Sequence, residues 1–336
     1  MRWRAVFAGV GVAGMLAACG GGGPTESPTA TPTPAHTSGS GSETSAAPSG
    51  TATPVTERVD IDVVGDGIPE HKLDLFLPKD QGPGPFPLVI WVHGGGWQGG
   101  DKSDIGRGED IQMVQTKELL LDHGYAVAAP NYHVLPNTKF PQPMQDVSAA
   151  VRHLRAHAAE YGLDSQRFAL MGDSAGGHLA SMTAMTPDKP DLQGTLGDTS
   201  VDARVKAFVG VYGIYDLTMR TEDQKNVCGG GKPGAESSHG RLVGADPDSP
   251  EGEPAARAAS PVTYVGPQSP PALLLAGRQD CTAPYPQAQR FHDALKAAGV
   301  PTELTIIDKS HGDPQFFTDP AIHDQLLRFL DSHVKN

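Results

Sequence analysis

The chain has 336 residues, which is enough for one large domain or two small ones with a sizeable core. Its formal net charge is −13 and it has no basic stripe that would neutralise phosphates, so nucleic acid is excluded as an expected partner. Glycine and proline are more frequent near the N-terminus, where residues 1–56 hold 10 of the 41 glycines and 6 of the 30 prolines.

The N-terminus carries the pattern of an export signal. A short basic stretch, Met1–Arg4, precedes an apolar run, Ala5–Ala17, that is too short to span a bilayer as a stable helix. The run leads into the sequence LAACG, which resembles a bacterial lipoprotein signal, where the cysteine is lipidated and becomes the new N-terminus. The resemblance predicts a signal peptide over residues 1–18, a lipid anchor on Cys19 and an extracytoplasmic protein held at the cell membrane. Ordinary secretion with cleavage nearby is the alternative.

The next segment, residues 20–56, consists of Gly, Ser, Thr, Pro and Ala with almost no large apolar side chains. Such a segment cannot bury enough surface to offset its ordering entropy, so we expect a disordered tether. The predicted organisation is a signal peptide (1–18), a lipidated cysteine with its linker (19–56) and one folded domain (57–336).

The folded part begins with two stretches that alternate apolar and polar residues, Val59–Val64 and Lys72–Leu77, as half-buried strands do. Continuous apolar runs, typical of strands buried on both faces, alternate with helical patterns after them. The expected buried strands are Leu88–Val92, Ala126–Ala129, Phe168–Met171, Val205–Tyr212, Ala272–Ala276 and Leu304–Ile307, and the expected helices are Met113–Leu121, Val147–Tyr161, Tyr285–Ala298 and Leu326–Val334. This alternation predicts an α/β fold with a mostly parallel central sheet flanked by helices.

The segment GDSAGG, residues 172–177, joins a predicted strand to a helical pattern. The pattern Gly-x-Ser-x-Gly in this context is typical of a nucleophile elbow, a turn so tight that β-carbons two residues on either side of the serine would clash. Glycine therefore serves at Gly172 and Gly176, and the hydroxyl of Ser174 is expected to project above the sheet. A structural serine in a tight turn is the alternative.

A second glycine run, Gly94–Gly96, follows the buried strand that ends near Val92. Glycine lets the backbone approach a substrate closely and present N–H donors. We assign the N–H groups of Gly95, Gly96 and Ala175 to a hole that would stabilise the oxyanion of a tetrahedral intermediate. The alternatives are a flexible loop and a phosphate-binding loop, although the Lys-Ser/Thr pair of a P-loop is missing.

A serine hydroxyl is a poor nucleophile until a base takes its proton, and the base needs an orienting acid. His311 lies after the last predicted strand and is the candidate base among 13 histidines. Asp280 follows an apolar strand and is the candidate acid, with Asp216 as its rival. The chain order Ser174, Asp280, His311 is that of the α/β-hydrolases.

Other polar groups receive structural interpretations. His178 is expected to pack within the helix after Ser174, and His93 beside the glycine run. His153 and His157 are four residues apart and could bind a metal ion, but the preferred interpretation is that they lie on an exposed face of a helix. The acidic stretch 246–253 lacks calcium-loop spacing and is interpreted as a helix start. No metal and no cofactor are expected.

From about Lys72 to its C-terminus the chain resembles α/β-hydrolase esterases, chiefly the hormone-sensitive-lipase-like and bifunctional feruloyl/acetylxylan-esterase-like branch. The runs HGGGWQGGDK, PNYHVLPNTKFPQPMQDVSAAVRHLRAHAAEYGLDSQRFALMGDSAGGHLA, ASPVTYV and PPALLLAGRQD carry the resemblance. It implies an oxyanion hole after His93 and the roles of nucleophile for Ser174, acid for Asp280, base for His311 and structural acid for Asp146.

The chain departs from that family in two places. Family members often carry D-x-x-V-P where this chain has DCTAP, with Cys281 after Asp280, and a polar insert from about Thr218 to Arg241 contains Cys228. With Cys19 lipidated, Cys228 and Cys281 remain as an even pair outside the cytoplasm. A disulfide between them is one expectation, and two unrelated thiols are the other.

These features predict a serine carboxylesterase that works through an acyl-enzyme. Its expected partner is a small-molecule or carbohydrate ester, of short-chain or acetyl/feruloyl type, at the cell surface. A non-catalytic surface lipoprotein that binds a small ligand, or a serine peptidase of the same fold, is the alternative. The acyl group, the alcohol and the oligomeric state do not follow from the sequence.

Overall fold

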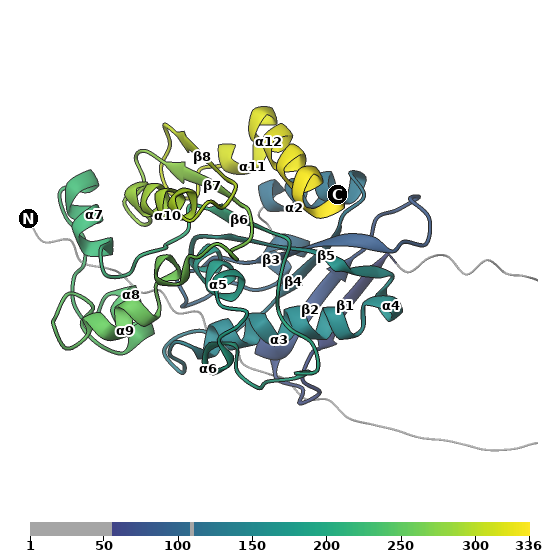
Figure 1. The fold of residues 1–336 in the computed structure, drawn as a ribbon, viewed down its shortest axis with the longest axis horizontal. Helices are drawn as coiled ribbons and strands as arrows, with labels where there is room; N and C mark the ends of the chain where they lie inside the picture. The colour runs from purple at the N-terminus through teal and green to yellow at the C-terminus, as the bar shows by residue number, and fades with distance from the viewer. Residues whose placement is uncertain (1–55, 108–110) are drawn as a thin grey trace, which may run out of the picture. The chain divides into compact units, whose positions relative to one another are not determined.

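The computed structural model describes residues 56–107 and 111–336 (Figure 1). The predicted signal peptide, Cys19 and the linker up to residue 55 lie outside the described residues. None of the described helices combines the length and apolar character that crossing a membrane requires.

The described residues form one eight-stranded sheet in the order β1-β2-β4-β3-β5-β6-β7-β8. β1 and β2 pair antiparallel, as do β2 and β4, and the remaining neighbours pair parallel. The strands are β1 Glu57–Asp62, β2 Lys72–Phe76, β3 Phe86–Val92, β4 Ala126–Pro130, β5 Leu163–Asp173, β6 Ala207–Val211, β7 Ala272–Gly277 and β8 Thr302–Ile307. The expectation of a mostly parallel sheet flanked by helices is confirmed.

Helices cover both faces of this sheet; in Figure 1, α2 and α12 lie on one side and α3 and α5 on the other. The α-helices are α1 Ser103–Gly106, α2 Ile111–Asp122, α3 Gln142–Ala156, α4 Ala158–Tyr161, α5 Ser174–Met185, α6 Pro190–Gln193, α7 Arg220–Cys228, α8 Ser238–Val243, α9 Glu253–Ala258, α10 Pro286–Ala297, α11 Gln315–Thr318 and α12 Pro320–Leu330.

The hydrophobic core is divided by the sheet into two clusters. On β3, Leu88, Ile90 and Val92 belong to the cluster that includes α3, α5 and α10, whereas Val89 and Trp91 belong to the cluster that includes α2, α11 and α12. Because both faces are covered, every residue of β3 is buried, which accounts for its continuous apolar run.

Two regions differ from the sequence-based expectation. The polar insert after β6, for which no elements were expected, contains the short helix α7 and the start of α8. The last helix begins at Pro320, earlier than the expected Leu326, because the Asp319 side chain caps it by accepting a hydrogen bond from the Ala321 N–H. It ends at Leu330, and Asp331–Lys335 continue as a π-helical turn.

The topology brings the segments that follow five strands to one edge of the sheet. β3, β5, β6, β7 and β8 are consecutive parallel neighbours, so the segments that follow their carboxyl ends emerge on the same side. In open α/β sheets this is where ligands bind.

Candidate active site

Ser174 stands at the junction of β5 and α5, where the backbone turns abruptly. It has a φ of +51°, a left-handed conformation that non-glycine residues rarely adopt. A β-carbon on Gly176 would lie 2.1 Å from the carbonyl oxygen of Val92, and one on Gly172 would lie 2.5 Å from the carbonyl of Gly176. Only glycine fits at either position, so the turn has the geometry of a nucleophile elbow.

A continuous chain of hydrogen bonds joins Ser174, His311 and Asp280. The Oγ of Ser174 is 2.9 Å from Nε2 of His311, and Nδ1 of His311 is 2.7 Å from Oδ2 of Asp280. The other oxygen of Asp280 accepts the backbone N–H groups of Thr282 (2.7 Å) and Ala283 (2.8 Å). Because this buried carboxylate is held at both oxygens, it fixes the imidazole with Nε2 facing the serine.

The ring of Tyr212, at the end of β6, packs against the His311 imidazole. Their ring centroids are 4.7 Å apart, and Tyr212 in turn contacts Phe316 of α11 edge-on at 4.9 Å. Tyr212 is buried, so the contact limits rotation of the imidazole out of the plane that Asp280 sets. Sequence reasoning did not identify this residue.

The rival acid, Asp216, occupies a different environment. Its Oδ1 accepts hydrogen bonds from the N–H (3.1 Å) and hydroxyl (2.5 Å) of Thr218, and its Oδ2 lies 3.5 Å from the Arg290 guanidinium. These contacts close a turn after β6. The structure therefore brings Asp280 to His311 and gives Asp216 a turn-closing position.

The glycine loop after β3 packs against the residue that precedes the nucleophile. A β-carbon on Gly94 would lie 2.4 Å from Oδ2 of Asp173, and Gly95 and Gly96 have φ values of +112° and +63°. Ala175 is in the first turn of α5, where backbone N–H groups have no partner inside the helix. The glycine loop and the start of α5 thus lie beside the turn that carries Ser174.

A buried chain of side-chain contacts anchors the glycine loop. The indole N–H of Trp97 donates to Nδ1 of His178 at 3.2 Å, and Nε2 of His178 donates to the carbonyl of Ala259 at 2.7 Å. Burial lowers the pKa of His178 to about 4, so its imidazole is neutral near pH 7. His178 was expected only to pack; it also connects the loop to α5 and to the segment after α9.

His93 takes a structural position, as expected; of the two histidines at the C-terminal end of α3, His157 is exposed as expected, whereas His153 is half-buried. His93 bonds the Gly94 carbonyl through Nδ1 at 2.8 Å and stacks on Tyr132 with a centroid distance of 4.3 Å. His153 and His157 stack on each other at 4.5 Å, and Nε2 of His153 bonds the Tyr161 hydroxyl at 3.0 Å.

The insert after β6 is tied to the loop that carries Asp280. A disulfide joins Cys228, the last residue of α7, to Cys281, with Cα atoms 5.8 Å apart. The Arg220 guanidinium donates twice to the Thr282 carbonyl (3.2 and 3.0 Å), and Nε2 of Gln224 donates to the Cys281 carbonyl at 2.9 Å. Arg220 is buried, which lowers its pKa to about 10, so it remains charged at neutral pH. Sequence reasoning found the cysteines but not Arg220 or Gln224.

The fold is that of an α/β-hydrolase, and its geometry places the Ser174 hydroxyl within hydrogen-bond distance of His311. Residues 73–295 match the family described as BD-FAE, and the chain belongs to that family. It is 34% identical over 227 residues to the probable carboxylic ester hydrolase LipM of Mycobacterium tuberculosis, covering 67% of this chain and 49% of LipM. The chain spans about half the length of LipM and of other curated relatives that it matches.

Solved structures share the fold over most of the chain. Esterase Est2 of Thermogutta terrifontis with bound propionate has 26% identity and a TM-score of 0.62, covering 83% of this chain and 93% of its own. A truncated carbohydrate esterase from gut microbiota has a TM-score of 0.74 at 24% identity, covering 84% and 98% respectively, and this similarity concerns the fold alone.

Removal of the disulfide should destabilise the domain. The bond closes a separation of 53 residues, for which the chain-entropy relation gives about 4 kcal/mol. We expect the Cys228→Ser/Cys281→Ser variant to lose about this much free energy of unfolding in urea, and the reduced wild-type chain to match it. A Cys19→Ser variant is the control and should unfold like the wild type. A loss below about 1 kcal/mol in the double variant would contradict the expectation.

The neutral His178 should make stability pH-dependent. Its pKa is about 4 in the folded state against an ordinary 6.5, so between these values the unfolded chain binds a proton that the folded chain does not. The contribution is complete above pH 6.5 and is lost as the pH falls toward 4, amounting to about 3 kcal/mol. A His178→Gln variant keeps a donor and an acceptor but does not titrate. Its unfolding free energy, measured in urea at pH 7, 6 and 5, should fall less steeply than that of the wild type; equal slopes would refute the assignment.

Proposed function

We propose that this chain is a carboxylic ester hydrolase that uses Ser174, His311 and Asp280 through an acyl-enzyme intermediate. The observation that carries the proposal is the unbroken hydrogen-bonded chain from the Ser174 hydroxyl to the buried Asp280 carboxylate. The named activities of the relatives, a probable carboxylic ester hydrolase and an esterase, support the same chemistry.

In the first half-reaction, Oγ of Ser174 attacks the ester carbonyl carbon while Nε2 of His311 takes the hydroxyl proton. The carbonyl π electrons move to oxygen, and the imidazolium is stabilised by Asp280 through Nδ1. The tetrahedral intermediate then collapses: the bond to the alcohol oxygen breaks, and His311 gives its proton to the departing alcohol. In the second half-reaction water repeats the attack, which releases the carboxylic acid and returns the proton to Ser174.

The N–H groups of Gly95, Gly96 and Ala175 would bind the oxyanion in both half-reactions. Loss of one such donor typically costs about 2.7–4 kcal/mol of transition-state stabilisation. The anchoring of Trp97 to His178 keeps the loop in place while the charge develops, so the donors need no reorganisation during the reaction.

We propose short acyl groups and a polar, carbohydrate-like alcohol as the substrate. A pocket of about 250 Å³ includes in its wall Gln98, which is two residues after the glycine loop, and Arg241 donates to Oε1 of Gln98 at 3.4 Å. Polar side chains alone line this pocket: Gln98, Arg220, Gln224, Lys232, Glu236, Ser237, Ser238 and Arg241. Polar side chains can hydrogen-bond a hydroxyl-rich ligand, whereas a long alkyl chain would need a pocket lined by apolar side chains. The propionate bound to Est2 supports the choice of a short acyl group.

We also propose that the enzyme works outside the cytoplasm, anchored through Cys19. The lipoprotein-like signal in the sequence supports this location. The Cys228–Cys281 disulfide supports it independently, because such bonds persist in oxidising compartments and are rare in the cytosol.

Replacement of the nucleophile tests the proposal. Ser174→Ala should lower kcat for an aryl acetate about 10⁶-fold, as losing the nucleophile does in a comparable triad enzyme, with the fold intact by circular dichroism. Ser310→Ala, an exposed serine beside His311, is the matched control and should keep wild-type activity. Retention of a tenth of the activity by Ser174→Ala would overturn the mechanism, and an inactive wild type would favour a ligand-binding lipoprotein.

Paired aspartate variants test the assignment of the acid. Asp280→Asn should reduce kcat by about 10⁴-fold, because an amide at this position favours the wrong imidazole tautomer. Asp216→Asn should leave kcat nearly unchanged, since Asp216 bonds Thr218 and Arg290. Steady-state kinetics on the same aryl acetate distinguishes the two, and the reverse ranking would move the acid to the loop after β6.

A further inference from the structure

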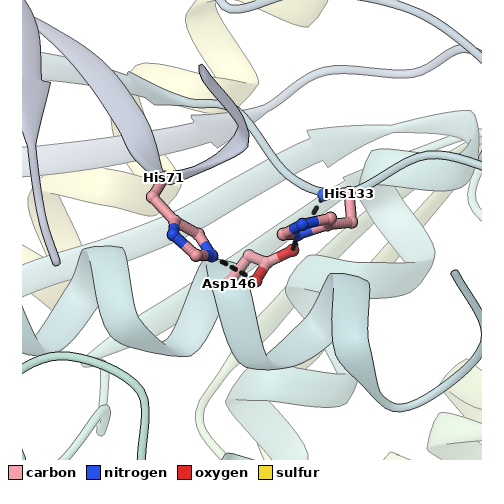
Figure 2. A group of neighbouring side chains, drawn as sticks. All are labelled: His71, His133 and Asp146. Carbon is pink, nitrogen blue, oxygen red and sulfur yellow. Dashed lines mark hydrogen bonds and ion pairs between the residues drawn. The ribbon is translucent and has the colours of Figure 1, made fainter. Parts of the chain in front are cut away.

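A second cluster of polar side chains lies apart from the catalytic chemistry. His71 precedes β2, His133 follows β4, and Asp146 is on α3; Figure 2 shows the two imidazoles turned toward the carboxylate. One ligand atom from each residue lies within 4.8 Å of the others. We call these three residues the His–Asp cluster.

The imidazole of His71 is oriented and left with an unused lone pair. Its Nδ1 bonds Oδ2 of Asp66 at 2.8 Å; because a carboxylate only accepts, Nδ1 carries a proton, and in the neutral ring Nε2 then carries the lone pair. His71 is 5% exposed, and its Nε2 has no hydrogen-bond partner. This Nε2 lies 3.5 Å from Oδ1 of Asp146, so a buried lone pair faces a carboxylate oxygen. A cation between the two atoms would satisfy both.

The other two members complete a donor set. Oδ2 of Asp146 accepts both the backbone N–H and Nδ1 of His133 at 2.8 Å, and Oδ1 accepts Nε2 of Gln142 at 3.3 Å. Asp146 is buried, and removal from water raises its pKa despite these partners. Two imidazoles and one carboxylate are a donor set that zinc takes from proteins, with water in the fourth position.

We propose that His71 Nε2, His133 Nδ1 and the Asp146 carboxylate bind one Zn²⁺ ion. Tetrahedral bonds of about 2.0–2.1 Å hold ligand atoms about 3.3 Å apart, close to the 3.5 Å between His71 and Asp146. The ion replaces the proton on Nδ1 of His133, which leaves to solvent. Asp66 then completes a carboxylate–histidine–zinc arrangement, in which the outer carboxylate orients the ligand. The site departs from the expectation that the chain holds no metal.

A pocket beside the His–Asp cluster connects it to solvent, and the positions of the three ligands indicate that the ion would stabilise the fold. His133 and Gln142 line a pocket of about 700 Å³, which provides a path from solvent. His71 precedes β2, His133 follows β4 and Asp146 is on α3. A bound ion would therefore cross-link these three segments. No step of the proposed ester hydrolysis uses the cluster, and the effect of the ion is on stability.

Zinc titration of the chelator-stripped, full-length chain tests this site. Isothermal titration calorimetry should show one saturable equivalent of Zn²⁺. At free zinc 100 times the Kd, the unfolding equilibrium constant measured in urea should fall about 100-fold. His71→Gln should abolish the saturable binding. Asp66→Asn, which leaves the ligands in place at a partly exposed site, should weaken it at least tenfold.

The double variant His153→Gln/His157→Gln is the matched control, because these histidines stack on each other at the C-terminal end of α3 and could bind zinc outside the His–Asp cluster. It should bind zinc like the wild type. The proposal is overturned if the wild type shows no saturable binding, if His71→Gln and Asp66→Asn both bind as tightly as the wild type, or if the control loses the binding. If the wild type shows no saturable zinc binding, the His–Asp cluster is a hydrogen-bonded contact between the three segments that carry it. If His71→Gln fails to fold, Asp66→Asn decides.

Discussion

The crossing of the β5–α5 turn over the end of β3 is the constraint on which the rest of the site depends. The Val92 carbonyl passes so close to Gly176 that no side chain fits there, and Ser174 must adopt a left-handed backbone conformation. Such a conformation costs about 1–3 kcal/mol and persists only where the surroundings over-determine it. Here the buried β3 strand and the interior of α5 hold the turn. The serine hydroxyl therefore projects toward His311, and the glycine loop lies beside it.

Hydrogen bonds hold two polar side chains near this turn, Asp280 and His178, in fixed positions. Asp280 is held by two N–H groups and an imidazole, so its carboxylate orients His311 without moving. His178 is kept neutral by burial, which leaves Nδ1 free to accept from Trp97. Protonation of His178 would remove that acceptor and release the glycine loop. The position of the glycine loop thus depends on His178, a residue outside the proposed triad.

Local patterns in the sequence predicted the parallel strands and the elbow, because burial on both faces and a glycine-flanked serine each leave a short, contiguous signature. His311 and Asp280 could be predicted because each follows a recognisable strand. The contacts of Arg220 with Thr282, and of His71 with Asp146, could not be predicted, since they join segments far apart in the chain through side chains with no motif of their own. Helix α7 was missed because its nine residues are mostly polar and carry no clear apolar stripe.

The most direct measurement is the site of covalent modification by an organophosphate ester such as paraoxon, which phosphorylates the similar Thermogutta terrifontis esterase 2. Intact-mass spectrometry of the treated chain should show one diethylphosphoryl group per molecule. Peptide mapping should place it on Ser174, because within residues 56–107 and 111–336 only this hydroxyl is hydrogen-bonded to an imidazole that a buried carboxylate orients. An unmodified chain, or an adduct on any other residue, would contradict the assignment of Ser174 as an activated nucleophile.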